Sequence, residues 1–228
     1  MAINRVERID DRADLRHVLV SVSDKRGLDT FVPELLRLNP EVQIFSTGGT
    51  FSHLEKILGG PAGRNLTQVS DYTGQPETQG GLVKTLDFKI YLGLLTETYN
   101  PAHQADLKRT NSVPIDMVVV NLYPFRETVS KAGVTVEEAR GNIDIGGPCM
   151  IRAAAKNFIR VAAVVDPSDY SMIISELKAS EGKISLALRF RLAQKAFAHT
   201  ADYDRAIADY LSGQSPAGVS ACYRYQSE

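Results

Sequence analysis

Two stretches, HVLVSVSDK at residues 17–25 and VQIFSTGGT at residues 42–50, decide the fold of this chain. Each begins as a Val/Ile-rich run and ends in hydroxyl-bearing side chains, glycine or lysine. Two further runs, IDMVVVNLYPF at 115–125 and VAAVVDPSD at 161–169, end in the same abrupt way. Apolar runs without strict alternation are typical of strands buried on both faces of a parallel sheet. The sequence therefore predicts a parallel sheet whose polar strand tips meet at one edge, where open α/β sheets bind their ligands.

Length and composition limit the classes of protein to consider. The chain has 228 residues and a net charge of −1, which suits one α/β domain over 16–228 after a polar arm at 1–15. The near-neutral charge gives no reason to expect a nucleic-acid partner. No apolar run approaches the ~20 residues that span a bilayer, and residues 1–16 lack the apolar core of a signal peptide. Cys149 and Cys222 show no metal-ligand spacing, so we expect no metal site, reduced thiols and a cytoplasmic protein, with a single disulfide as the alternative.

Helical and loop signals alternate with the strand runs. A short third strand is expected at 67–70, a loop rich in turn formers occupies 71–81, and 84–95 stays unassigned. Thr135 and Glu138 form a capping box, and Pro167 stands at a first helical position. The alternation indicates an α/β fold with right-handed crossovers. The helices are predicted over 27–37, 50–58, 100–110, 136–140, 147–156, from Pro167 onward, and over 185–211, where a break near Thr200 is left open.

Two hydroxyl-rich turns suggest an anion site. Ser21, Ser23 and Lys25 stand where the first strand gives way to a helix, whose free N–H groups and partial positive charge favour phosphate. The alternative is that Ser23 only caps the helix and Lys25 is a solvated charge. At the second strand, Ser46, Gly48, Gly49 and Thr50 repeat the arrangement, and the glycines allow a close backbone approach.

Neither turn has the spacing of a known nucleotide motif. A Walker motif is absent, and no G-x-G-x-x-G follows a strand. Alone, Gly48-Gly49 would equally suit a tight turn, but two such turns at one edge favour phosphate. Lys84 and Thr85, after the long loop, could meet the same anion, although a lone lysine is usually a surface charge.

The later tips carry groups suited to a heteroaromatic base and to proton transfer. Asn121 and Tyr123 offer an amide, a phenol and an aromatic surface, unless the segment is only an aromatic plug that ends a strand. Asp144 precedes Gly146-Gly147, whose backbone donors could stabilise an oxyanion. Lys156 follows about nine helical residues later, some 14 Å away, so its meeting with Asp144 is not settled by spacing. The alternative is an ordinary capped helix with an exposed lysine.

These tips, in this order, resemble the IMP cyclohydrolase domain of the bifunctional purine-biosynthesis protein. The resemblance covers roughly residues 16–211 and implies a methylglyoxal-synthase-like, Rossmann-like three-layer α/β fold with a mainly parallel sheet and additional C-terminal helices. It also implies closure of the purine ring of 5-formamidoimidazole-4-carboxamide ribonucleotide (FAICAR) to IMP, without metal or redox cofactor. The matching segments are SVSDK at 21–25, STGGT at 46–50, VSDYTG at 69–74, VKTL at 83–86, VVNLYPF at 119–125, GVTVEEA at 133–139, NIDIGGP at 142–148, IRAAAKN at 151–157 and KAFAHTADYD at 195–204.

The resemblance also implies roles for single residues. It assigns the 5′-phosphate to Ser21, Ser23, Lys25, Thr50 and Thr85. It places the base and the formyl group among Lys84, Asn121, Tyr123, Asp144 and Lys156. The chemistry then predicts Asp144 as the acceptor of the amide proton and Lys156 as the donor near the formyl oxygen.

The family pattern is broken after the long loop. Leu82 replaces an expected arginine, Asp87 an expected histidine, and Tyr91 a second histidine. Losing a cation and gaining an acid should weaken anion binding unless another cation compensates. The candidates for that compensation are Arg64, Lys89 and Arg152.

We therefore predict an IMP cyclohydrolase that forms a homodimer through its C-terminal helices. Because the matching sequence ends near Leu211, we also expect a stand-alone domain whose formylated substrate comes from a separate enzyme. The alternative function is a non-catalytic, purine-nucleotide-binding regulatory module, which would not need Tyr123, Asp144 and Lys156 together. A methylglyoxal-synthase-like lyase is disfavoured because the histidines fall in unsuitable positions.

Overall fold

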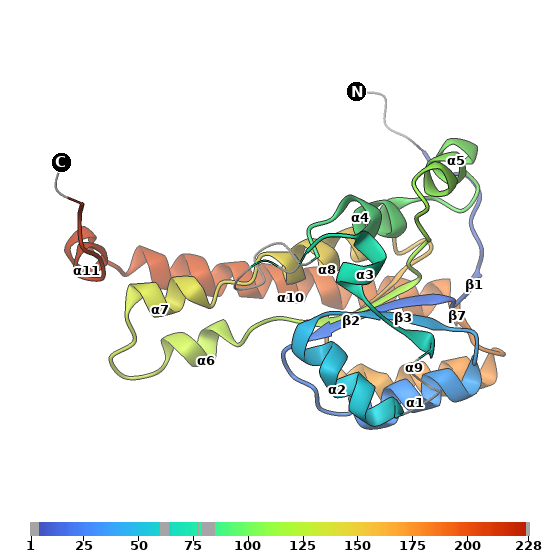
Figure 1. Ribbon diagram of the computed structural model, residues 1–228, viewed down its shortest axis with the longest axis horizontal. Helices are drawn as coiled ribbons and strands as arrows, with labels where there is room; N and C mark the ends of the chain where they lie inside the picture. The colour runs from blue at the N-terminus through green and yellow to red at the C-terminus, as the bar shows by residue number, and fades with distance from the viewer. Residues whose placement is uncertain (1–4, 60–63, 77, 79–84, 227–228) are drawn as a thin grey trace.

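A five-stranded parallel sheet forms the centre of the protein in a computed structural model that describes residues 5–59, 64–76, 78 and 85–226 (Figure 1). The strands lie in the order β4-β3-β2-β5-β6, and every neighbouring pair is parallel. The predicted parallel sheet is confirmed. Its strands are β2 (His17–Val22), β3 (Gln43–Ser46), β4 (Leu66–Gln68), β5 (Met117–Asn121) and β6 (Ala162–Val164).

The strand order explains where a ligand would bind. The chain runs outward from β2 to β3 and β4, then returns to the other side of β2 for β5 and β6. The order therefore reverses between β2 and β5, whose last paired residues are Val22 and Asn121. The crevice beyond the carboxyl ends of strands at such a switch point is the usual ligand site of open α/β sheets.

Helices cover both faces of the sheet and give the predicted three layers (Figure 1). Side chains of β2 alternate between two cores: Val18 and Val20 belong to one, and Leu19 belongs to the other. The first core is completed by α1 (Leu28–Leu38), α2 (Gly48–Leu58) and α9 (Tyr170–Ala179). The second is completed by α4 (Phe88–Leu95) and α8 (Gly146–Lys156), while α10 (Leu186–Ser212) runs beside β6 and contributes to both.

The structure corrects several local predictions. The expected third strand at 67–70 is present as β4 but ends at Gln68, because α3 (Val69–Thr73) begins there. This helix also takes up the first three residues of the expected loop at 71–81, of which 77 and 79–81 lie outside the described residues. The unassigned 84–95 segment contains α4. Helix α10 continues through Thr200, whose hydroxyl donates to the carbonyl of Phe197 instead of breaking the helix. The remaining elements are α5 (Pro101–Arg109), α6 (Phe125–Val129), α7 (Val136–Gly141) with the predicted capping box, η3 (Pro167–Asp169) and α11 (Pro216–Ser220).

Part of the predicted N-terminal arm is fixed by a buried arginine. Within it, β1 (Arg12–Asp14) pairs antiparallel with β7 (Lys183–Ser185). The fully buried guanidinium of Arg189 donates to backbone carbonyls on both sides of this pair. Its acceptors are the carbonyl oxygens of Asp10, Asp11, Phe158, Ile159 and Ile184. A lone arginine on a helix gives no sign of this role in the sequence.

The carboxyl-terminal half of α10 projects away from the sheet together with α6, α7 and α11 (Figure 1). The chain enters this extension from the tip of β5 through α6. The link from α7 to α8 then leads back to the carboxyl edge of the sheet. Across the described ranges, no helix is long and apolar enough to cross a membrane.

Candidate active site

A cavity of 450 Å³ lies at the carboxyl edge of the sheet, beyond the ends of β2 and β5. Its walls come from five segments that are distant in the sequence: the tip of β2, the turn from β3 into α2, residues 85–86 before α4, the tip of β5, and the link from α7 into the start of α8. The structure thereby brings most of the predicted site residues into one space. Those that line it are Ser21, Ser23, Lys25, Gly48, Gly49, Thr50, Thr85, Asn121, Tyr123, Asp144, Gly146 and Gly147.

The hydroxyl groups at one end of this cavity divide into structural ties and free donors. Thr50 Oγ1 donates to the carbonyl of Val22 at 3.0 Å and accepts from its N–H at 3.1 Å, so this hydroxyl joins α2 to β2. Ser46 is fully buried, donates to the carbonyl of Val20 and lies outside the cavity lining. The Ser23 hydroxyl has no partner within the described ranges, and Ser21 pairs only with Thr47, at 2.8 Å between hydroxyl oxygens. Ser21, Ser23 and Thr47 are therefore the hydroxyls placed to meet a ligand.

Two helix N-termini supply positive potential to the cavity. The N-cap residues of α2 and α8, Thr47 and Ile145, form no side-chain capping hydrogen bond. Among the described residues, the N–H groups of Gly48 and Gly49 are thus left open at the start of α2, whereas at the start of α8 the N–H of Gly146 is open and that of Gly147 is taken by Asp144. Lys25 is the only cation among the described residues that line the cavity. The combination of a lysine, free hydroxyls and open helix N–H groups suits a phosphate.

Asn121 holds one of these turns in place. Its Oδ1 accepts the backbone N–H groups of Ser23 at 2.7 Å and Asp24 at 2.8 Å, and its Nδ2 donates to the carbonyl of Asp24 at 2.8 Å. The predicted hydrogen bonding of this amide to a base is thus limited to one remaining N–H. Asn121 serves mainly to fasten the 23–24 turn to the tip of β5.

Asp144 is the acidic group among the described residues that line the cavity. Its Oδ1 accepts the N–H of Gly147 at 2.9 Å, at the N-terminus of α8. Burial raises the pKa of this carboxyl above its ordinary value, and the backbone N–H groups of Gly147 and Tyr123 oppose the rise. The backbone N–H of Asp144 in turn donates to the hydroxyl of Tyr203, on α10, at 2.8 Å. A carboxylate with raised basicity in a partly desolvated site is suited to accept a proton.

The paired glycines are required by close contacts. A Cβ atom at Gly147 would lie 2.6 Å from both Asp144 Oδ2 and Leu122 Cδ2, and one at Gly146 would lie 2.6 Å from Thr85 Oγ1. The N–H of Gly147 is used by Asp144, so only the N–H of Gly146 remains for an oxyanion. Tyr123 stands at the mouth of the cavity with 52% of its surface exposed.

Two predicted catalytic lysines are not part of this described site. Lys84 lies outside the described residues. Lys156 is exposed in the last turn of α8, about 15 Å along the helix from Gly146, and does not line the cavity. The neighbouring Asn157 binds the carbonyls of Leu94 and Thr96, which fixes that end of α8 far from the sheet's carboxyl edge. Among the described residues, Lys156 thus lies apart from the cavity that Asp144 lines, and its role as proton donor stays a prediction.

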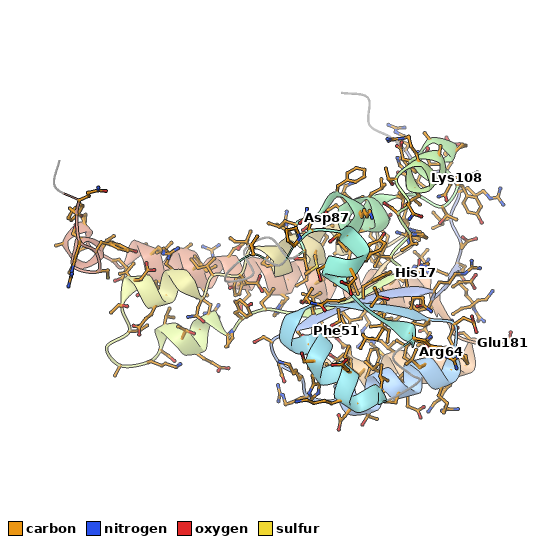
Figure 2. All side chains as sticks on the ribbon, in the orientation of Figure 1. His17, Phe51, Arg64, Asp87, Lys108 and Glu181 are labelled. Carbon is orange, nitrogen blue, oxygen red and sulfur yellow. The ribbon has the colours of Figure 1, made fainter. Side chains whose placement is uncertain are left out.

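The proposed compensating cations also lie elsewhere. Arg64 precedes β4 at the amino edge of the sheet (Figure 2). Lys89 donates to the carbonyl of Tyr72, and Arg152 lies over the ring of Phe197. None of these three lines the cavity. The acid that replaces the expected histidine, Asp87, caps α4 by accepting the N–H of Lys89 at 2.7 Å.

A larger neighbouring cavity of 870 Å³ shares Ser23 and Asn121 with the site. Its cations are already neutralised, because Arg26 pairs with Asp24, and Lys195 pairs with Asp166 and Asp169. This larger cavity is therefore less suited to bind an anion than the cavity beside Lys25. Among the described residues, no group of three or more His, Cys, Asp or Glu side chains is arranged to hold a metal ion.

Sequence reasoning missed two residues of the site. Thr47 sits within the recognised STGGT segment, so its position beside Ser21 could have been foreseen. Tyr203 lies 59 residues beyond Asp144 in a helix, and nothing in the local sequence links the two.

A parallel sheet with helices on both faces and a polar crevice at its switch point defines an open, doubly wound α/β domain. More specifically, the chain belongs to the family of MGS-like domains, whose family model matches residues 27–149. A second family model, described as the AICARFT/IMPCHase bienzyme, matches residues 154–227.

Similar proteins include several named bifunctional purine biosynthesis protein PurH. That of Synechococcus sp. (strain CC9605) is 48% identical over 199 residues, which is 87% of this chain and 37% of the relative. That of Acidithiobacillus ferrooxidans is 47% identical over 205 residues (90% and 38%), and that of Bacillus subtilis is 48% identical over 198 residues (87% and 37%). The chain thus spans little more than a third of these relatives. The crystal structure of ForH is similar with a TM-score of 0.76 and 29% identity, over 90% of this chain and 98% of that one.

Proposed function

We propose that this chain is an IMP cyclohydrolase, which closes the second purine ring of FAICAR and releases water to give IMP. The observation that carries the proposal is the placement of Asp144 in the same cavity as Lys25 and the N-termini of α2 and α8. A ribonucleotide monophosphate presents a phosphate at one end and a reacting base at the other. The likeness to bifunctional purine biosynthesis proteins over nine-tenths of the chain supports the same activity.

The anion end would hold the 5′-phosphate. Lys25 supplies the charge, the hydroxyls of Ser21, Ser23 and Thr47 donate hydrogen bonds, and Thr85 lies beside Gly146 on the opposite wall. The open N–H groups of Gly48 and Gly49 add donors at the start of α2. Thr50 and Asn121 contribute by fixing the two turns, and Ser46 contributes in the same indirect way.

The acidic end would carry the chemistry. The carboxamide nitrogen of FAICAR attacks the formyl carbon, and Asp144 accepts the proton that this nitrogen gives up. The formyl oxygen takes up that proton and becomes a hydroxyl. The former formamide nitrogen then gives up its own proton as it forms the new C=N bond, and the hydroxyl takes up this second proton and leaves as water. Both reacting groups belong to one substrate molecule, so the attack is intramolecular, and the cavity contributes by holding the carboxamide nitrogen close to the formyl carbon in a reactive orientation.

The other groups at this end would orient the base and stabilise developing charge. Tyr123 lies over the cavity mouth, where its ring and hydroxyl can contact the base. The free N–H of Gly146 can stabilise the oxygen of the tetrahedral intermediate. From the sequence alone, we keep Lys84 as a further candidate residue around the base and the formyl group, and Lys156 as the candidate donor near the formyl oxygen.

The direct test is to add FAICAR to the purified protein and follow the ultraviolet absorbance of IMP. Asp144→Asn should lower kcat by about 10²–10⁴, because it removes the proton acceptor while preserving shape. Lys25→Ala should instead raise KM about 10- to 100-fold, the loss expected for a charged hydrogen bond. Asp209→Asn and Lys56→Ala are matched controls on exposed helix surfaces that should leave both constants unchanged. Binding of FAICAR without conversion would overturn the proposal in favour of the regulatory module.

We also propose a homodimer in the cytoplasm. Phe190 and Phe197 lie seven residues apart on α10, hence on one side of the helix, and expose 47% and 39% of their surface. A second copy packed on this side would cover both rings. Light scattering after size exclusion should show a dimer that Phe190→Asp/Phe197→Asp converts to a monomer. A monomeric parent would contradict this.

A further inference from the structure

Tyr203 connects α10 to two other segments near Asp144: α6, which follows β5, and the link that precedes α8. Its hydroxyl accepts the backbone N–H of Asp144 at 2.8 Å and donates to the carbonyl of Asn142 at 3.3 Å. Its ring packs edge-on against Phe125, with centroids 6.2 Å apart. Tyr203 is only 8% exposed and does not line the cavity. One side chain thus touches the segment after β5 and the segment before α8 without meeting the ligand space.

The contacts of Asp144 show what this hydroxyl controls. The carboxylate is fixed from the front by the N–H of Gly147, at 2.9 Å from Oδ1. The backbone that carries the carboxylate is fixed from behind by Tyr203. Within the described residues, the N–H of Asp144 has no other partner, so nothing else restrains residue 144 on that side. If the hydroxyl were lost, the turn from α7 to α8 could relax, and the carboxylate would leave its place.

We propose that Tyr203 is a positioning residue for the proton acceptor Asp144, an inference that rests on the proposed cyclohydrolase function. Tyr203 acts through backbone geometry, holding residue 144 so that its carboxylate faces the amide of the substrate. It contributes nothing to the anion end, because Lys25 and the serine turns are held by other contacts. Tyr203 should therefore affect the rate of ring closure and leave phosphate binding unchanged.

The test is Tyr203→Phe, which keeps the ring and removes only the hydroxyl. We expect kcat for FAICAR to fall about tenfold, the loss that one buried hydrogen bond of ordinary strength predicts. The Kd for ribose 5-phosphate, measured by calorimetry, should stay within twofold of the parent. Tyr210→Phe is the matched control: Tyr210 lies on the same helix and packs against the same Phe125 ring, at 5.9 Å, and its hydroxyl makes no contact with residue 144. It should leave kcat and Kd unchanged.

A double-mutant cycle separates positioning from general support of the fold. In an Asp144→Asn background there is no carboxylate to aim, so adding Tyr203→Phe should not lower kcat further. Additive losses would overturn the proposal, as would a kcat unchanged by Tyr203→Phe. A parallel loss of ribose 5-phosphate affinity would also overturn it, because it would mean general loosening of the site.

Amide hydrogen exchange tests the geometry without any turnover. The N–H of residue 144 should exchange at least tenfold faster in Tyr203→Phe and at the parent rate in Tyr210→Phe. Equal exchange in all three proteins would refute the restraint itself. If the three proteins show this exchange pattern and yet the parent does not convert FAICAR, the proposed function fails while the positioning contact stands. The two failures are therefore distinguishable.

Discussion

The close contacts around Gly147 give a prediction whose sign departs from the usual rule for helices. Replacing an exposed helical glycine by alanine ordinarily stabilises a protein by up to about 1 kcal/mol. At Gly147, however, the added Cβ would lie 2.6 Å from the Asp144 carboxylate and 2.6 Å from Leu122. Such overpacking of a buried site costs about 1–3 kcal/mol. The overlap therefore outweighs the helix gain, and Gly147→Ala should destabilise the fold by about 1 kcal/mol.

Gly49 provides the matched comparison. It lies in the first turn of α2 on the wall of the same cavity, and its Cβ position has no atom within 4 Å. Gly49→Ala should be neutral or stabilising, so urea unfolding should separate the two variants by about 2 kcal/mol, with equal m-values. Gly147→Ala should also lower kcat, because the displaced group is the Asp144 carboxylate. Equal stability of the two variants would refute the contact argument.

Three further predictions follow from individual contacts. Asn121→Ala removes the three hydrogen bonds that hold the 23–24 turn, so ribose 5-phosphate affinity should fall at least tenfold by calorimetry; unchanged affinity would show that the turn holds itself. Burial raises the pKa of Asp144, so the folded state binds the proton of this carboxyl more tightly than the unfolded chain does. Stability therefore falls as pH rises from the ordinary pKa of an aspartate through the raised pKa of the folded state, where the buried carboxylate becomes charged. Asp144→Asn should therefore raise the urea midpoint at pH 7–8, and this gain should disappear in acid; a gain independent of pH would contradict the cause given. Arg189→Met leaves buried carbonyls unpaired and should lower the free energy of unfolding in urea by about 3 kcal/mol or more. Arg191 is an exposed neighbour, and Arg191→Met should change that free energy by less than about 0.5 kcal/mol. Similar losses in the two variants would refute this reasoning.

The strand runs and the tips could be predicted from the sequence because both depend on local patterns. Apolar runs such as 115–120 are long enough to require burial on both faces, and their polar ends must fall at one sheet edge when the strands are parallel. Helices with caps were placed within two residues for the same reason, as with the capping box at Thr135. The candidate cavity follows from these two facts.

The distribution of hydrogen bonds could not be predicted, because it depends on contacts between distant segments. Thr50, Ser46 and Asn121 carry suitable donors, yet the fold uses them to join β2 to its neighbours. The sequence shows which groups gather at an edge and leaves open which remain free for a ligand. Lys156 illustrates the same limit in another way, since its family segment matches well while the length of α8 keeps it away from the cavity.

Asp87 shows how a departure from the family pattern can be compatible with the anion site. A carboxylate in place of the expected histidine should repel phosphate if it faced the cavity. Instead Asp87 is 7% exposed and accepts the N–H of Lys89, so its charge is directed to the N-terminus of α4, where a negative group is stabilising. Thr85, two residues earlier, lies against Gly146 and lines the cavity, whereas Asp87 does not. The charge of Asp87 is offset by the N-terminus of the helix that it caps. The change from the expected histidine to aspartate therefore removes a cation without placing an opposing charge in the proposed phosphate site.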